Sequence, residues 1–105
     1  MTKPASSESG LSQRRIFRVV MALSGHETLG LQLAEVQRAA EIANPSTAHR
    51  DLQLLKEIGV AEQIAETGRW RLGPKLVQIA LAFTDNLDKS ERRLGEIRQR
   101  FTRLP

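Results

Sequence analysis

A chain of 105 residues, of which 40% are apolar, is long enough for one small domain with at most an appended helix. It has no cysteine, which excludes disulfides, thiolate metal sites and cysteine nucleophiles, and its histidines, His26 and His49, lack ligand-like spacing. The formal net charge is +4, but residues 89–105 carry six basic and two acidic side chains, so the whole excess lies in this tail. No apolar run approaches the roughly 20 residues of a membrane span, so we expect a cytoplasmic protein without membrane contacts.

The first part of the chain predicts a polar arm followed by a helix. Residues 1–11 are serine-rich with one basic side chain, Lys3, and we expect a disordered arm that is solvated in preference to binding DNA. Ser12 is expected to cap a helix over residues 13–23. Its apolar positions at helical spacing should face a core: Ile16, Phe17, Val20 and Leu23.

Three arginines lie on or near the exposed side of this helix, namely Arg14, Arg15 and Arg18. They indicate either contacts with a nucleic-acid backbone or a solvated helix face, and the sequence does not separate the two interpretations.

A loop over residues 24–30 is expected to lead into a minimal strand at Leu31 that pairs with a later hairpin. The second predicted helix covers residues 33–42, with Glu35 in its first turn, where the helix dipole favours an acid. Its core positions are Leu33, Val36, Ala39 or Ala40, and Ile42. The turn that follows lacks the glycine found in many helix-turn-helix units.

The third predicted helix has strong start and stop signals. Asn44 suits the N-cap position, Pro45 the first helical position, and Gly59 the residue just past the end, where φ is positive. Four apolar residues form one stripe that should face the core: Ala48, Leu52, Leu55 and Ile58. The opposite face carries hydroxyl, guanidinium and amide groups, which suit phosphates and base edges.

A β-hairpin is predicted directly after this helix. Residues 60–64 and 69–72 flank a turn at residues 65–68. Arg69 and Arg71 alternate with Trp70 on the return strand, so Trp70 should point into the core as an anchor and not serve as a base-stacking platform.

The order of these elements, with three sequence motifs, resembles the DNA-binding domain of IclR-type transcriptional regulators. The motifs are Leu31-x-Leu33-Ala34-Glu35-Val36, then Ser46-Thr47-Ala48-His49-Arg50-x-Leu52-x-x-Leu55-x-x-Ile58-Gly59-Val60, then Trp70-Arg71-Leu72-Gly73. The resemblance covers about residues 14–83 and implies a winged helix-turn-helix that binds DNA. Family members continue into a large effector-binding domain, and we expect only the DNA-binding domain here, with no small-molecule ligand.

The chain after Gly73 predicts one long helix over residues 74–104. Its first two turns are apolar nearly all round and should be buried. Further along, apolar residues alternate spacings of four and three, a heptad pattern with Ser90 as its polar break. These residues predict a homodimer: Phe83, Leu87, Leu94, Ile97, Phe101 and Leu104. A straight parallel coiled coil would pair Arg93 with Arg98, so we expect an antiparallel or a broken arrangement, bent near residues 86–90.

The sequence thus predicts a mainly α protein in three parts: the arm (1–11), a winged helix-turn-helix with a three-helix core and a hairpin wing (12–73), and a helical dimerisation segment (74–105). The leading hypothesis is a dimeric, nucleoid-associated transcriptional regulator of double-stranded DNA, with no enzymatic activity, cofactor or metal. The residues expected to contact DNA are Asn44, Ser46, Thr47, His49, Arg50, Gln53, Arg69 and Arg71. For His49, a phosphate contact and a plain surface role are equally supported. The alternatives are a protein-interaction module and an architectural DNA binder with little sequence preference.

Overall fold

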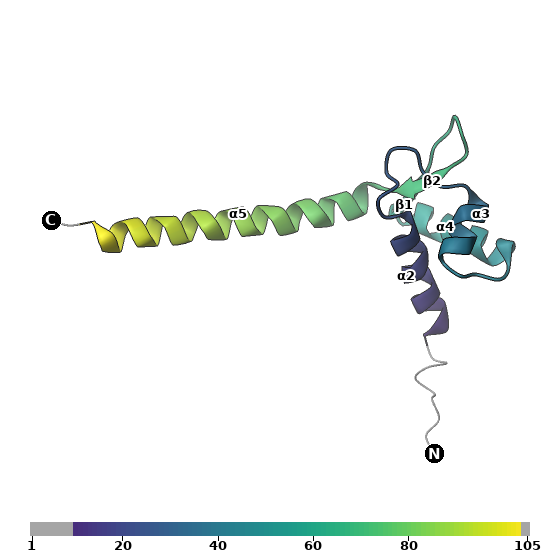
Figure 1. Cartoon of the computed structure of the whole chain (residues 1–105), viewed down its shortest axis with the longest axis horizontal. Coiled ribbons are helices and arrows are strands. Elements are labelled where there is room, and N and C mark those ends of the chain that lie inside the picture. The colour runs from purple at the N-terminus through teal and green to yellow at the C-terminus, as the bar shows by residue number, and fades with distance from the viewer. Residues whose placement is uncertain (1–9, 104–105) are drawn as a thin grey trace, which may run out of the picture. The chain divides into compact units, whose positions relative to one another are not determined.

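The computed structural model describes residues 10–103 (Figure 1). Over this range the chain is mainly helical, with four helices and one two-stranded antiparallel sheet. The elements are α2 (Leu11–Leu23), α3 (Leu33–Ala39), α4 (Pro45–Glu57), β1 (Ala61–Gln63), β2 (Trp70–Leu72) and α5 (Pro74–Thr102). The chain divides into two units, and the boundary between them lies between Pro74 and Lys75 in the sequence. Most of the expected N-terminal arm lies outside the described residues.

Helix α2 begins two residues earlier than the sequence predicted. Gly10, with φ of 82°, precedes the first turn, and its carbonyl accepts the backbone N–H of Arg14 at 2.8 Å. The prediction that Ser12 caps the helix is therefore wrong, because Gly10 occupies the N-cap position and Ser12 lies within the first turn. The assignment of Phe17 to the core is also wrong, since 69% of this residue is exposed. Val19 is buried instead. It lies two residues after Phe17, which places its side chain about 200° around the helix, on nearly the opposite side.

Helices α3 and α4 end in the same Schellman motif. After α4, Gly59 donates its N–H to Lys56 and Val60 donates to Leu55, at 3.1 and 2.8 Å. After α3, Glu41 donates to Arg38 and Ile42 to Gln37, at 3.2 and 2.9 Å. The residue in the left-handed position is Gly59 (φ 83°) in the first case and Glu41 (φ 57°) in the second. The sequence missed this early stop of α3 at Ala39, because glutamate rarely takes the left-handed conformation. Ala40, and not Ala39, is the buried alternative.

This comparison predicts that Glu41→Gly stabilises the domain by about 1 kcal/mol, because glycine adopts positive φ without a steric penalty. Urea unfolding should show a higher midpoint with an unchanged slope. Gly59→Ala is the reciprocal control and should destabilise the domain by a similar amount. An unchanged midpoint for Glu41→Gly would show that the left-handed position after α3 is not strained.

The start of α4 and the hairpin agree closely with the sequence. The side chain of Asn44 accepts the N–H of Ser46, and Pro45 occupies the first turn. Strands β1 and β2 pair with Ala61 opposite Leu72, and both are shorter than predicted. Leu31 forms an isolated bridge with Trp70, with an N–H to carbonyl bond of 2.8 Å in each direction, as expected for the minimal strand.

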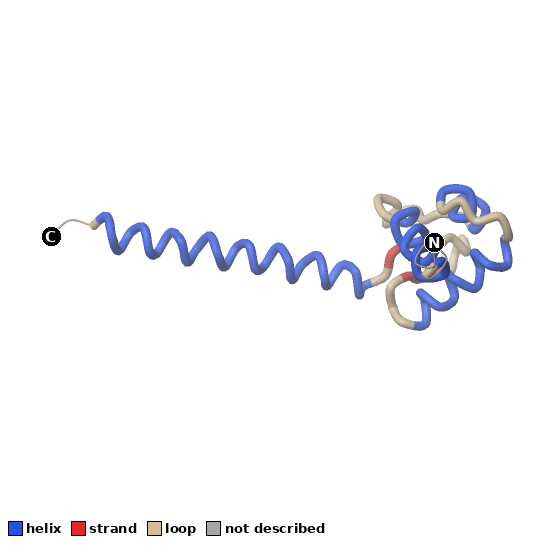
Figure 2. The backbone as a smooth tube through the Cα atoms, turned by 90° about the horizontal axis from the view of Figure 1, so that it is seen from below, coloured by secondary structure: helices blue, strands red, loops and turns tan. Residues whose placement is uncertain are grey.

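The core lies between α2, α3, α4 and the hairpin, which group together in Figure 2. Trp70 is only 2% exposed, which confirms its predicted role as a core anchor. Ile58 was expected to complete the apolar stripe of α4, but it is 52% exposed because it lies past the last helical turn, at the C-cap. The buried apolar residues are Val19, Leu23, Leu31, Val36, Ala40, Ile42, Ala48, Leu52, Leu55, Ala61 and Trp70.

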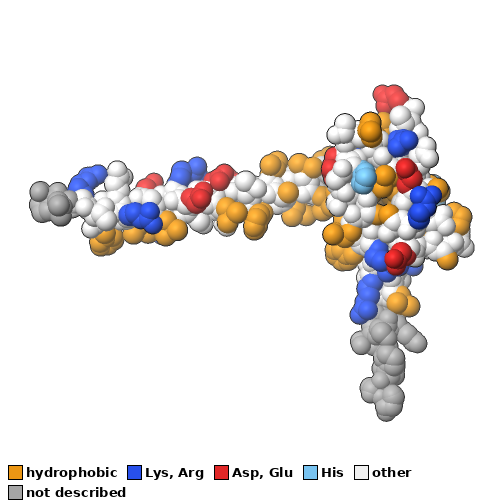
Figure 3. Space-filling view, in the orientation of Figure 1, with side chains coloured by type: hydrophobic (Ala, Val, Ile, Leu, Met, Phe, Trp, Pro, Cys, Tyr) orange, Lys and Arg blue, Asp and Glu red, His pale blue; other side chains and the backbone are white. Residues whose placement is uncertain are grey.

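Helix α5 is continuous over 29 residues, so of the two arrangements expected for the dimer the one broken near residues 86–90 is wrong, and the antiparallel one stays a prediction. Lys89 and Asp85 form an i,i+4 ion pair at 3.1 Å, one of several such pairs that the charge pattern allows. None of the described residues of α5 is buried, which also corrects the prediction that its first two turns are buried within the chain. Figure 3 shows hydrophobic side chains on both edges of the first turns of α5 and on one edge further along.

No helix in the part of the chain that the structure describes is long and apolar enough to cross a membrane.

Candidate nucleic-acid interface

Helical spacing separates α4 into an inner side of buried apolar residues and an outward face of polar residues. Ala48, Leu52 and Leu55 are buried, whereas Ser46, His49 and Arg50 are exposed and Thr47 and Gln53 are half-buried. Ser46, Arg50 and Gln53 follow one another at spacings of four and three, so they share one side of the helix. The structure therefore brings together the polar side chains that the sequence singled out on α4.

Asn44 and Ser46 are engaged with each other at the start of α4. The Oδ1 atom of Asn44 accepts the backbone N–H of Ser46 at 2.9 Å and its hydroxyl at 2.7 Å. The carbonyl of Asn44 also accepts the N–H groups of Thr47 and Ala48, at 3.1 and 3.2 Å. This cap fixes the first turn, and it leaves the amide nitrogen of Asn44 and the acceptor side of the Ser46 hydroxyl as the groups available to a ligand.

His49 connects the outward face of α4 to the hairpin. Its Nε2 atom lies 3.3 Å from Nε2 of Gln53, one turn further along the helix. Its ring meets that of Trp70 edge to face, with centroids 6.4 Å apart and an interplanar angle of 81°. The structure therefore gives His49 a packing contact that neither interpretation from the sequence included.

The two arginines of the hairpin are half-buried and bound within the domain. Arg69 donates from Nη1 to the Gly30 carbonyl at 3.3 Å and lies 3.8 Å from Oε1 of Glu35. Arg71 donates from Nε to Oε2 of Glu62 at 2.6 Å, across the hairpin, and from Nη1 to the Glu27 carbonyl at 3.5 Å. Each guanidinium thus shares its charge with a carboxylate, and a phosphate would compete with that partner.

A partly buried ion pair that was not predicted from the sequence joins α2 to α4. Arg15 donates from Nε and Nη2 to the two oxygens of Asp51, at 2.5 and 2.9 Å, and the Asp51 side chain is 7% exposed. Nearby, Arg18 donates to the Ala40 carbonyl at 2.8 Å. Both arginines therefore connect helices. A signal existed at Asp51, which lies three residues after Ala48 and one before Leu52, inside the apolar stripe.

The hydrogen bond to Asp51 raises the pKa of the Arg15 guanidinium above its ordinary value, with burial opposing the shift. A cation whose pKa is higher in the folded state than in the unfolded state stabilises the fold fully at pH values below the unfolded-state pKa. This stabilisation is lost as the pH rises through the folded-state pKa. The contribution of Arg15 is therefore constant over the physiological pH range.

We expect Arg15→Ala to lower the free energy of unfolding by about 2–4 kcal/mol, because it leaves a buried carboxylate without its partner. The double variant Arg15→Met/Asp51→Leu removes the carboxylate as well and should lose clearly less stability than Arg15→Ala. Urea unfolding of both variants tests this. Equal losses would indicate that packing, and not the unpaired charge, sets the cost.

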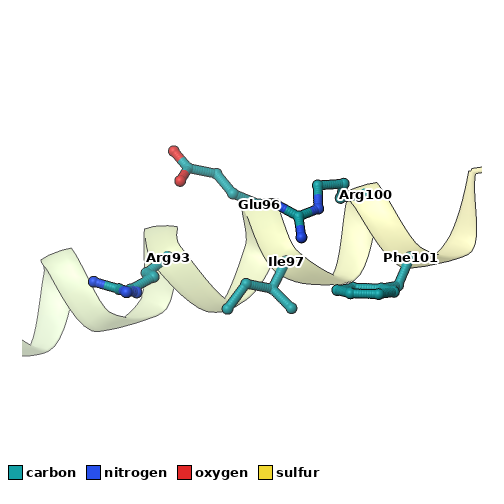
Figure 4. Close-up of a pocket in the computed structure, with 5 residues that line it drawn as sticks. All are labelled: Arg93, Glu96, Ile97, Arg100 and Phe101. Atoms are coloured by element: carbon teal, nitrogen blue, oxygen red, sulfur yellow. The ribbon is translucent and has the colours of Figure 1, made fainter.

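The residues predicted to support dimerisation lie on α5 and are exposed in the chain. Phe83, Leu87, Leu94, Ile97 and Phe101 have exposures of 66, 49, 62, 44 and 73%. Leu104, the last of the set, lies outside the described residues. Figure 4 shows Ile97 and Phe101 on one side of α5 with Glu96 pointing away, beside a shallow groove also lined by Arg93 and Arg100. The guanidinium of Arg100 lies 5.1 Å from the centre of the Phe101 ring.

Over residues 10–103 the structure contains no group of three or more histidine, aspartate or glutamate side chains placed to hold a metal ion. No protein-family model matches the chain, and no curated protein matches it. The similarity to IclR-type domains therefore rests on the quoted motifs and stays a prediction.

Proposed function

We propose that this chain is a sequence-specific transcriptional regulator of double-stranded DNA that acts as a homodimer. In this proposal α3 and α4 form a helix-turn-helix of the IclR type, the hairpin is its wing, and α5 joins two copies. One observation carries it: α4 buries one side in the core and presents Ser46, Arg50 and Gln53 on the other. Ser46 and Arg50 lie in the N-terminal half, the part of the recognition helix that contacts base edges in helix-turn-helix proteins.

The chemistry of this face fits the edges of base pairs. The guanidinium of Arg50 can donate two hydrogen bonds to guanine, and the Gln53 amide can pair with adenine. At the start of α4, the amide nitrogen of Asn44 can donate a hydrogen bond to a phosphate oxygen. The proposed setting is the nucleoid in the cytoplasm.

Selection of bound sequences from a random DNA pool tests the proposal directly. The selected DNA should bind at least about a thousandfold more tightly than scrambled DNA, and the affinity should fall steeply with salt. Strong binding without sequence preference would instead indicate an architectural DNA binder.

A second candidate function, protein interaction through the same domain, is favoured by the hairpin. Its two arginines are paired with Glu35 and Glu62, so their positive charge is partly balanced within the domain. Absence of DNA binding at low salt would favour this alternative.

The contribution of the wing is a separate prediction. Arg69→Ala/Arg71→Ala should flatten the slope of log affinity against log salt by about one to two units and leave the selected sequence unchanged. The control Arg92→Ala/Arg103→Ala removes the same charge from α5 and the residue after it. If the wing variant retains the wild-type slope, the hairpin does not touch DNA.

A further inference from the structure

We propose that α5 pairs with a second copy of itself in an antiparallel register whose two-fold axis passes between Asp88 and Lys89. The proposal deepens the proposed homodimer and rests on it. It concerns the α5 seam, the row of residues at spacings of four and three along the helix: Leu76, Ala80, Phe83, Leu87, Ser90, Leu94, Ile97 and Phe101.

The seam needs a partner surface that is also helical and apolar. Its large members from Phe83 to Phe101 are between 44 and 73% exposed, and a heptad repeat is the pattern that packs against another helix. A second copy supplies a matching row of the same length. The residues within and beside the seam determine the direction and the register in which the two helices pair.

Two rows flank the seam. Val77, Thr84, Glu91 and Arg98 follow one side, and Ile79, Asn86, Arg93 and Arg100 follow the other. In a parallel pair, each residue of the second row meets the next residue of the first row on the partner. Arg93 would then face Arg98 of the other copy, and two-fold symmetry repeats this repulsion.

Volumes in the seam also disfavour the parallel pair. Identical seam residues would face each other, so Ala80 would meet Ala80 and Phe101 would meet Phe101. Packed cores instead place large residues against small ones, because two small residues leave a void and two large ones strain the backbone.

The antiparallel register removes both problems. With the axis between Asp88 and Lys89, Ala80 faces Ile97 of the other copy and Ser90 faces Leu87, so each small residue meets a large one. Phe83 faces Leu94, and Leu76 faces Phe101. Because α5 runs from Pro74 to Thr102, this axis lies near its midpoint, and nearly the whole helix is paired.

The flanking rows are then complementary along their length. In an antiparallel pair each row meets itself, so Val77 lies beside Arg98 and Ile79 beside Arg100 of the other copy. The remaining flanking contacts are Thr84 with Glu91 and Asn86 with Arg93, and none joins like charges. The alkyl stems of the arginines can cover the apolar flanks while their charged ends reach water. This explains why the first turns of α5 carry hydrophobic side chains on both edges (Figure 3), whereas its last turns are rich in arginine.

The neighbouring antiparallel registers are worse. A shift of one heptad that moves the axis to Arg92 places Glu91 against Glu91 and Arg93 against Arg93. The opposite shift, to Asp85, leaves Phe101 beyond the end of the paired helix. In the proposed register the two Pro74 residues, where the chains enter α5, lie about 44 Å apart at ~1.5 Å per residue.

Engineered disulfides test direction and register, since the chain has no cysteine of its own. Ala80→Cys and Ile97→Cys are made in separate full-length chains, mixed under reducing conditions to exchange subunits, and then oxidised in a glutathione buffer. Neither variant alone should cross-link, because each cysteine lies far from its own copy. The mixture should cross-link up to about half of the chains, the fraction that random assortment places in mixed dimers.

The controls separate the other outcomes. Cross-linking of each variant alone would overturn the proposal in favour of a parallel pair. Cross-linking of Leu87→Cys with Ile97→Cys, but not of Ala80→Cys with Ile97→Cys, would overturn it in favour of the axis at Arg92. A dimer in sedimentation that gives none of these cross-links would overturn the proposed register, in favour of the axis at Asp85 or of an interface outside α5. A monomer would overturn the homodimer as well. Binding of the selected DNA, measured on the same samples, reports separately on the proposed DNA-binding function.

Discussion

Leu94→Glu should make the protein monomeric and reduce its affinity for the selected DNA by at least about a hundredfold. Leu94 is 62% exposed in the single chain and lies near the middle of the second half of the α5 seam. A buried, unpaired carboxylate there would cost more than the pairing of the two helices provides. Because a dimer holds two half-sites together, its loss removes the gain in effective concentration, which commonly amounts to a factor of 10² to 10⁴.

Sedimentation velocity and DNA-binding titrations measure the two effects. Gln99→Glu is the matched control, because it adds the same charge to α5 at a position away from the seam. Truncation after Asp85 removes the rest of the seam and should give the same result, although it also removes the whole basic tail. A truncated chain that remains dimeric and binds equally tightly would show that the seam is not the dimerisation element.

Arg50→Ala should weaken binding to the selected DNA by roughly 1–3 kcal/mol per site and relax the preference at one base pair of each half-site. Arg50 is exposed on the outward face of α4, one turn after Ser46, where a guanidinium can bond to guanine through two nitrogens. Repeating the selection with the variant gives the change in preference directly.

Lys56→Ala is the control for Arg50, since it removes one positive charge from the last turn of the same helix. It should weaken binding to selected and scrambled DNA alike, or not at all. If Arg50→Ala also weakens both DNAs equally, Arg50 contacts a phosphate and another residue reads the base.

The contacts that depend on neighbouring residues were predictable. The Asn44 cap, the stop at Gly59 and the hairpin are set by hydrogen bonds that span a few residues, and the helical spacing of Ala48, Leu52 and Leu55 indicated their burial. The stop at Glu41 is just as local, but it uses a residue that rarely adopts positive φ, so composition gave no sign of it. Phe17 shows the limit of periodicity, because Phe17 and Val19 lie on nearly opposite sides of α2, both are apolar, and only packing decides which of them is buried.

The sequence by itself determined the capped α4, the hairpin with Trp70 in the core, and the heptad repeat of α5, because each depends on residue types at fixed short spacings. Only the tertiary structure decided which long-range partner each arginine side chain binds. Arg15 meets Asp51 across 36 positions of the chain, and Arg69 meets the carbonyl of Gly30 across 39. Such partners are chosen by the packing of helices and hairpin and not by spacing. The polar face of α4 could therefore be predicted from the sequence, whereas the intramolecular pairing of the hairpin arginines could not.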